Sequence, residues 1–385
     1  MSLPLSLRSA ASGLTFLICS GAIQAETFVS IQDGKHMLVN GATQVVTGED
    51  TLSILELKSG QLRIVEEIGV PASVIGPPTS LAVVPGGHIA LVTAGFRRDP
   101  KDASKVLPDD VVSVVDIRST PPRVIDTLHA GMGAAGISVN RMGTLALVAN
   151  HQEGTVSVLS IEGTTVKVIE KIDLENAKSG PMHVAITPDS KRALVSRDGD
   201  NKVTLLNISP SNRVTLAKRD LFPGQRPDCV DVRPQADLAI VANIGRGQGD
   251  ADTLSLIDLS VEPPRVVDTV SVGQTPESAF FLPGGQYVGV NVMSGSNKAS
   301  NSPFYQKGGN FLLLRVENKR LVRVASAPIG AWPQGLAFSE DGRYALVQNS
   351  ADRNIELLQI DGEKVAPTGQ RLPFKGALAS IQPVR

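Results

Sequence analysis

A unit of four short apolar segments recurs along this chain. In one copy the segments are PMHVAI from Pro181, RALVSR from Arg192, KVTLLNI from Lys202 and RVTL from Arg213. The same order recurs from Pro78, Ala134, Pro227, Pro276 and Pro333. The third segment, in which apolar and polar residues alternate as in a half-buried β-strand, begins near positions 51, 111, 155, 202, 253, 310 and 354. The chain therefore contains seven copies of a four-stranded unit.

A four-stranded unit of roughly 40 to 55 residues is typical of a β-propeller blade. We therefore predict an all-β fold, a seven-bladed β-propeller of four-stranded antiparallel blades. The 36 glycines and 25 prolines supply the many tight turns that such a fold needs. Because each blade contacts only its neighbours, residues 26–385 are expected to form a single domain.

Closure of the ring is expected to involve both ends of the chain. The segment Ala377–Pro383 matches the first strand of the other units, whereas the first unit lacks such a strand. We predict that Ala377–Pro383 pairs with N-terminal residues near 36–40. Such pairing would remove an exposed sheet edge.

The first 25 residues have the order of a secretory signal peptide. Arg8 precedes an apolar stretch that ends at Cys19, and small and polar residues follow up to Ala25. This pattern predicts a signal peptide over 1–25 that is cleaved after Ala25. The mature protein is then expected to be periplasmic or secreted, with no membrane insertion. It retains one cysteine, Cys229, so no internal disulfide is expected.

The segments of these units resemble the YVTN-repeat β-propellers. Leu-Val-Ala-Asn150 and Ile-Val-Ala-Asn243 stand where the tetrapeptide that names this family occurs, and the resemblance covers nearly all of residues 27–385. The resemblance implies an exported propeller. It leaves the activity open, because the family includes surface-layer components and relatives of lactonases and of dehydrogenase subunits.

Composition argues against several classes of ligand. With 37 Lys and Arg against 38 Asp and Glu, the formal charge is -1, and aromatic residues make up 4% of the chain. No nucleic-acid partner is expected, because such binding needs a basic surface and stacking aromatic side chains. No haem motif or metal-ligand spacing occurs, and the sequence predicts no metal and no cofactor.

Function is expected on the face where the second-to-third strand loops surround the channel mouth. Three such loops are predicted to be long: Ala94–Asp110, Asn243–Asp252 and Met293–Gly309. The first residues of each inner strand should converge beside this mouth. The candidate catalytic residues there are His183, Asp228 and Glu277, and the candidate ligand-binding residues are Arg197, Arg226, His151, Gln334 and Trp332.

Three functions remain open at this point. The first is an exported scaffold that binds a periplasmic protein partner or a small polar ligand, because no catalytic motif is present. The second is a hydrolase of a sugar lactone. ALVANH ending at His151, GTVSV from Gly154 and PMH from Pro181 are similar to segments of the lactonase branch of propellers. The third is a propeller subunit of a periplasmic redox enzyme.

Overall fold

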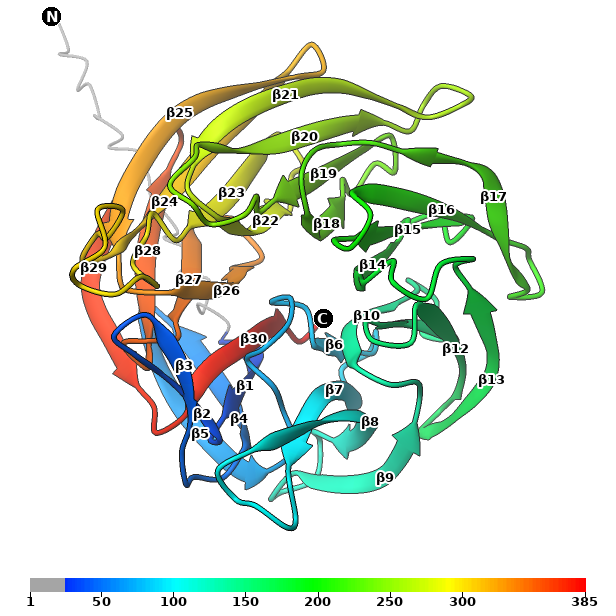
Figure 1. The fold of residues 1–385 in the computed structure, drawn as a ribbon, viewed down its shortest axis with the longest axis horizontal. Helices are drawn as coiled ribbons and strands as arrows, with labels where there is room; N and C mark the ends of the chain where they lie inside the picture. Colours follow the sequence, from blue (N-terminus) through cyan, green and yellow to red (C-terminus); the bar gives the residue numbers. More distant parts are fainter. Residues whose placement is uncertain (1–24) are drawn as a thin grey trace, which may run out of the picture.

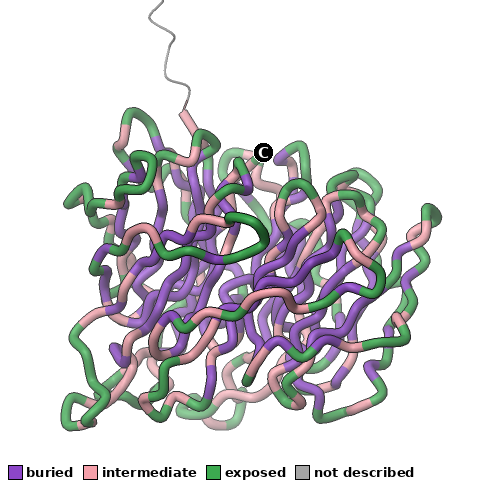
Figure 2. The backbone as a smooth tube through the Cα atoms, turned by 90° about the horizontal axis from the view of Figure 1, so that it is seen from above, coloured by how far each residue is buried: buried purple, intermediate pink, exposed green. Residues whose placement is uncertain are grey.

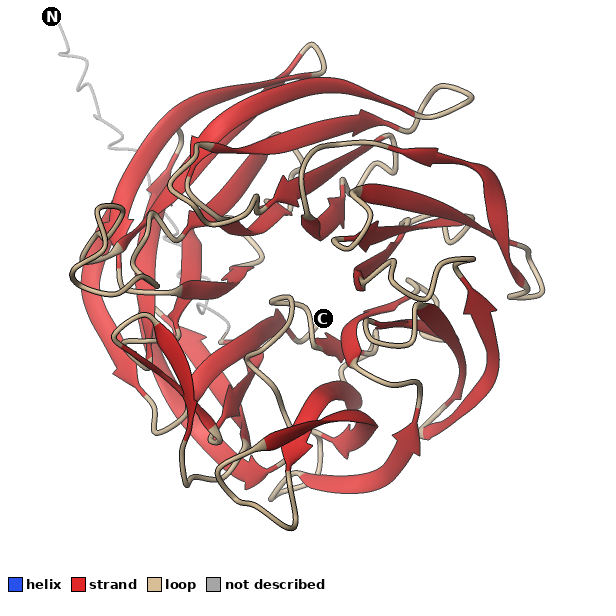
Figure 3. Ribbon diagram, in the orientation of Figure 1, coloured by secondary structure: helices blue, strands red, loops and turns tan. Residues whose placement is uncertain are grey.

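Seven four-stranded antiparallel sheets form a ring in the computed structural model, which describes residues 25–385 (Figure 1). Within these residues all regular structure is β-strand (Figure 3). The predicted seven-bladed propeller is confirmed, and each predicted third strand corresponds to a strand of the structure. The predicted signal peptide lies outside the described residues, except for Ala25.

Each blade runs from an inner strand at the channel to an outer strand at the rim. Blade one contains β30 (Ala377–Pro383), β1 (Glu26–Asp33), β4 (Thr51–Lys58) and β5 (Gln61–Gly69). Blade two contains β6 (Leu81–Val83), β7 (Ile89–Arg98), β8 (Val106–Asp116) and β9 (Arg123–His129). Blade three contains β10 (Ala134–Val139), β11 (Leu145–Asn150), β12 (Thr155–Glu162) and β13 (Thr165–Asp173).

The remaining four blades repeat this order. Blade four contains β14 (Pro181–Ile186), β15 (Arg192–Arg197), β16 (Lys202–Ile208) and β17 (Val214–Leu221). Blade five contains β18 (Pro227–Val232), β19 (Leu238–Asn243), β20 (Asp252–Asp258) and β21 (Arg265–Gly273). Blade six contains β22 (Pro276–Phe281), β23 (Tyr287–Val292), β24 (Gly309–Glu317) and β25 (Arg320–Ile329). Blade seven contains β26 (Pro333–Phe338), β27 (Tyr344–Asn349), β28 (Asn354–Asp361) and β29 (Lys364–Pro373).

Burial follows the position of a strand within its blade. Every residue of the second strand β11 is buried, whereas almost all residues of the outer strand β9 are exposed. The continuous apolar sequence LALVAN of β11 suits a strand covered on both faces. Apolar side chains of adjacent blades pack together, as Leu91 of blade two does with Val148 of blade three in one cluster. Figure 2 shows this buried interior beneath exposed turns.

Ring closure uses both ends of the described chain, as predicted, but the partner strand is different. β30 pairs antiparallel with β1, for example Phe28 with Pro383 and Asp33 with Ala377. The prediction that residues 36–40 pair with β30 is therefore wrong. The physical reason is that β1 carries Phe28 and Ile31, which are fully buried in the closed blade.

Residues 36–45 instead form a separate hairpin of β2 (His36–Val39) and β3 (Ala42–Val45). Its two-residue turn is Asn40-Gly41, and both residues have a left-handed φ, 44° and 79°. Asn-Gly favours this turn because Gly has no Cβ and Asn tolerates positive φ. The hairpin lies outside the blade sheets.

One of the three predicted face loops is shorter than expected. The prediction of a loop over Ala94–Asp110 is wrong, because β7 continues to Arg98 and β8 begins at Val106. Ladder pairs such as Arg97 with Leu107 extend the hairpin beyond the blade. The other two loops are long, as predicted, and span residues 244–251 and 293–308.

Candidate functional site

A cavity of about 470 Å³ lies at the channel mouth on the face of the long loops. Starts of inner strands, the β2–β3 hairpin and the loops after β19 and β23 contribute to its lining. Six of the eight candidate residues line it: His151, Arg226, Asp228, Glu277, Trp332 and Gln334. We call this space the mouth cavity.

A β-bulge at the start of the inner strand directs Asp228 into the mouth cavity. In blade five Pro227 pairs with Asn243 and Val230 with Val241, so two residues oppose the single residue Ala242. A bulge of this kind re-aims side chains and is frequent beside active sites. The same irregularity occurs at Gln334 in blade seven. A proline at the start of an inner strand thus predicts that the side chain of the next residue lines the cavity.

The residue before that proline has an unusual backbone conformation. Arg226, Thr275 and Trp332 have φ of 53°, 55° and 50°, and glycines occupy the equivalent positions 133 and 180 with φ of 76° and 58°. Left-handed φ is unfavourable for bulky and β-branched residues. Such strain is often found at functional sites. All three non-glycine side chains line the mouth cavity.

Asp228 and Glu277 form a pair of buried carboxyl groups with raised pKa values. Burial is the main cause in both residues, and the charge of Asp198 adds to the effect on Asp228. The pKa of Asp228 is raised to about 7, and the pKa of Glu277 lies well above its ordinary range, partly because Asp228 is near. Asp228 is almost completely buried, at 1% exposure. Even so, neither of its carboxyl oxygens has a hydrogen-bond partner among the described residues.

Beside this pair, Asp198 joins the side chains of Arg226 and His151. One of its oxygens accepts hydrogen bonds from Nε and Nη2 of Arg226, at 3.3 and 2.9 Å, and the other lies 3.2 Å from Nε2 of His151. Burial alone would raise the pKa of Asp198, but these hydrogen bonds and charges outweigh it and lower the pKa. Arg226 also donates from Nη1 to the carbonyl of Gly245. A guanidinium has five N–H donors, so two remain for a ligand.

His183 and Arg197 do not line the mouth cavity. His183 is buried in β14, where Nδ1 accepts a hydrogen bond from the amide of Val230, and burial lowers its pKa to about 3. Its neutral imidazole therefore bridges two inner strands. Arg197 is at the end of β15 and binds Asp200 and the hydroxyl of Thr204. His183 thus contacts β18, whereas Arg197 contacts the turn between β15 and β16 and Thr204 of β16.

Sequence reasoning missed the part of the cavity that lies outside the repeats. Leu38 on β2 and Val74 and Ile75 on the connection from β5 to β6 line the mouth cavity. Asn297 and Lys298 also line it; neither was a named candidate, although both belong to the loop Met293–Gly309 that the sequence predicted on this face. No repeat pattern marks these residues, because they belong to insertions between strands.

A second cavity, of about 720 Å³, opens at the opposite ends of the inner strands. Asp231 of β18 lines it, and burial raises the pKa of Asp231 to about 7. Among residues 25–385, no group of three or more His, Cys, Asp or Glu side chains has the arrangement of a metal site. Within the same residues no helix is long and apolar enough to cross a membrane.

Solved structures with the same fold include lactonases. A putative 6-phosphogluconolactonase from Bacteroides fragilis aligns with a TM-score of 0.71 and 16% identity over 95% of this chain and 99% of that chain. The periplasmic gluconolactonase PpgL of Pseudomonas aeruginosa aligns with a TM-score of 0.69 and 15% identity over 94% and 99%. At these identities the likeness shows the fold.

The fold is also shared with a redox enzyme. Dihydro-heme d1 dehydrogenase NirN aligns with a TM-score of 0.56 and 15% identity, over 93% of this chain and 75% of that chain. No protein-family model and no curated protein matches this sequence. The resemblance to the YVTN-repeat family therefore stays a prediction, while the seven-bladed propeller with lactonase-like structural neighbours is established.

Proposed function

We propose that this protein hydrolyses a lactone in the mouth cavity. The observation that carries the proposal is Asp228, a buried carboxyl group with two unpartnered oxygens and a pKa raised to about 7, which lines the same cavity as Arg226. A general base is most effective when its pKa lies near the pH at which the enzyme operates. The lactonases among the structural neighbours supply the class of substrate, and a sugar lactone is its first member to test.

Hydrolysis needs a base for water and a positive charge for the oxyanion. The ionised carboxylate of Asp228 would take a proton from water, and the hydroxide so formed would attack the lactone carbonyl carbon. The free N–H donors of Arg226 would stabilise the tetrahedral oxyanion. When the ring C–O bond breaks, the Asp228 carboxylic acid would return the proton to the leaving oxygen. The product is a hydroxy acid.

The other two candidate catalytic residues, His183 and Glu277, do not act as the base in this mechanism. His183 would need to gain a proton, but burial keeps its pKa at about 3. Burial and the nearby Asp228 raise the pKa of Glu277 well above its ordinary range, which favours its protonated form. A neutral Glu277 can donate a hydrogen bond to a substrate hydroxyl group or ring oxygen.

The test is hydrolysis of a panel of aldono- and acyl-lactones by the purified protein, followed by titration of the released acid at fixed pH. Asp228→Asn should lower kcat/KM on the order of a hundredfold or more, and Arg226→Ala on the order of a hundredfold. Asp231→Asn is the matched control. It lies on the same strand with a similarly raised pKa, but it lines the opposite cavity.

Full activity of Asp228→Asn, or no turnover above the buffer rate with any lactone, would overturn the proposal. The absence of turnover together with saturable binding of an aldonate would instead favour the scaffold that binds a small polar ligand. Export to the periplasm fits the periplasmic gluconolactonase among the neighbours. It is tested by the N-terminal sequence and cell fraction of the mature protein, with residue 26 expected first.

A further inference from the structure

We infer that the lactone taken by the mouth cavity carries an apolar substituent, which lies against a wall that includes Leu38, Ile75, Met293 and Trp332. The inference rests on the proposed function and narrows its class of substrate. It predicts alkyl-substituted lactones as better ligands than bare or polyhydroxylated ones.

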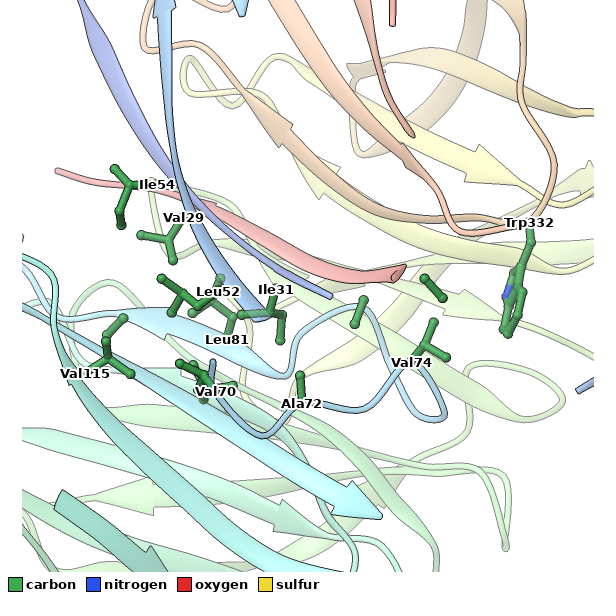
Figure 4. Close-up of a cluster of buried hydrophobic side chains, with 14 of the residues drawn as sticks. Val29, Ile31, Leu52, Ile54, Val70, Ala72, Val74, Leu81, Val115 and Trp332 are labelled. Atoms are coloured by element: carbon green, nitrogen blue, oxygen red, sulfur yellow. The ribbon is translucent and has the colours of Figure 1, made fainter. Parts of the chain in front are cut away.

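The apolar wall is contiguous. Val74, Met293 and Trp332 belong to one buried apolar cluster, and Leu38 and Ile75 pack against that cluster. All five residues also line the mouth cavity. Figure 4 shows Val74 and Trp332 at one end of the cluster, away from Ile54 and Val115. These five side chains therefore give the cavity an apolar wall.

The polar side chains that could act on a lactone ring come mainly from blades four and five. Asp198, Arg226 and Asp228 belong to blades four and five, or to the connection between them, and Glu277 begins the inner strand of blade six. The apolar wall comes from the β2–β3 hairpin, the connection from blade one to blade two and the residue before β26, together with Met293 directly after β23 of blade six. A ligand with one polar end and one apolar end would match this distribution of side chains.

The wall is held rigidly at its centre. The buried carboxylate of Asp33 accepts a hydrogen bond from the amide of Val74 at 2.9 Å and contacts Nδ1 of His36 at 2.7 Å. One carboxylate thus fixes both the base of the β2–β3 hairpin and the segment that carries Val74. On the other side, Nε2 of Gln334 donates to the carbonyls of Val74 and Gly76.

The tip of the hairpin is attached across the cavity mouth. Oδ1 of Asn40 accepts hydrogen bonds from the amide and the hydroxyl of Ser300, at 3.0 and 3.2 Å. Ser300 belongs to the loop after β23, so the hairpin spans from blade one to blade six. This contact holds Leu38 over the cavity and makes it a specificity-determining residue.

The test uses Trp332, the only tryptophan of the chain, as a fluorescent probe. Wild-type protein is titrated with 5-alkyl-pyrrolidin-2-ones whose chains grow from methyl to octyl, and with gluconolactam; lactams resist hydrolysis, so binding is measured without turnover. Each added methylene should tighten binding about two- to fourfold, until the chain outgrows the cavity. Gluconolactam should bind more weakly than the hexyl lactam.

Variants of the hairpin distinguish a loss of the apolar contact from a general loss of stability. Leu38→Asp should abolish the dependence on chain length, and Leu38→Met, which conserves volume, should retain it. Val39→Asp is the matched control, because Val39 is the next residue of the hairpin and does not line the cavity. It should behave like wild type.

The outcomes distinguish this inference from the proposed function. Affinity that does not rise with chain length, or that rises equally in Leu38→Asp, overturns the inference, even if gluconolactone is hydrolysed. Affinity that rises with chain length supports the apolar wall, even if no lactone is hydrolysed and the proposed function fails.

Discussion

Nε2 of Gln334 donates a hydrogen bond of 3.1 Å to the carbonyl oxygen of Val74, a residue far away in the sequence. Gln334 is the second residue of the inner strand of blade seven, and Val74 lies on the connection between blades one and two. A second bond, of 2.9 Å, reaches the carbonyl of Gly76. The side chain of Gln334 therefore joins blade seven to the connection between blades one and two at the edge of the mouth cavity.

Replacement of Gln334 by leucine should destabilise the protein by about 1–3 kcal/mol, because two buried carbonyl oxygens would lose their donor. Urea unfolding measures the free energy. The control is Gln359→Leu, at an exposed position of β28, which should change stability by less than about 0.5 kcal/mol. Equal effects of both substitutions would contradict the role assigned to Gln334.

The contribution of Asp228 to the free energy of unfolding should fall as the pH rises between about 4 and 7. The folded pKa of Asp228 is about 7, above its ordinary 3.8, so in this interval the folded state retains a proton that the unfolded state loses. The contribution is complete below pH 4 and is lost as pH rises through the folded pKa. Urea unfolding at several pH values should show a slope that Asp228→Asn reduces by up to about 1.4 kcal/mol per pH unit. An unchanged slope would show that Asp228 ionises normally.

Asp198→Asn should move the pH dependence of lactone hydrolysis to lower pH. The negative charge of Asp198 raises the pKa of Asp228. Asp198 also pairs with Arg226, and the positive charge of Arg226 lowers the pKa of Asp228. Loss of the Asp198 charge removes the direct repulsion and leaves the Arg226 charge less neutralised, and both effects lower the pKa of Asp228. The measurement is log kcat/KM against pH, and Asp200→Asn, which removes the partner of Arg197 away from the cavity, should leave the profile in place. A shift to higher pH would refute this account.

Leu378→Ala should destabilise the ring by about 2–5 kcal/mol, the usual effect of a cavity in a well-packed core. Leu378 is fully buried on β30, the strand that closes blade one. Ile169→Ala on the outer strand β13, where the side chain is 54% exposed, should cost less than about 1 kcal/mol. Thermal or urea unfolding compares the two. Similar small effects would mean that β30 contributes little to closure.

Much of this architecture could be read from the sequence. The alternation of apolar residues along the third strands defines seven blades, because the side chains of a half-buried strand follow a period of two, and a proline marks the start of several inner strands. The same proline locates Asp228, Glu277 and Gln334 beside the channel. A pattern that repeats along the chain can thus be recognised from a single sequence.

The tertiary structure decided the rest. His183 has the same place in its repeat as Cys229, one residue beyond the bulge residue that lines the cavity, and its side chain is buried between inner strands instead. Leu38 and Val74 lie in insertions without a repeat pattern, and only contacts between distant blades bring them to the cavity. Local sequence determines which residues form strands and turns. The packing of blades around the ring determines which side chains face the cavity and how far burial shifts their pKa values.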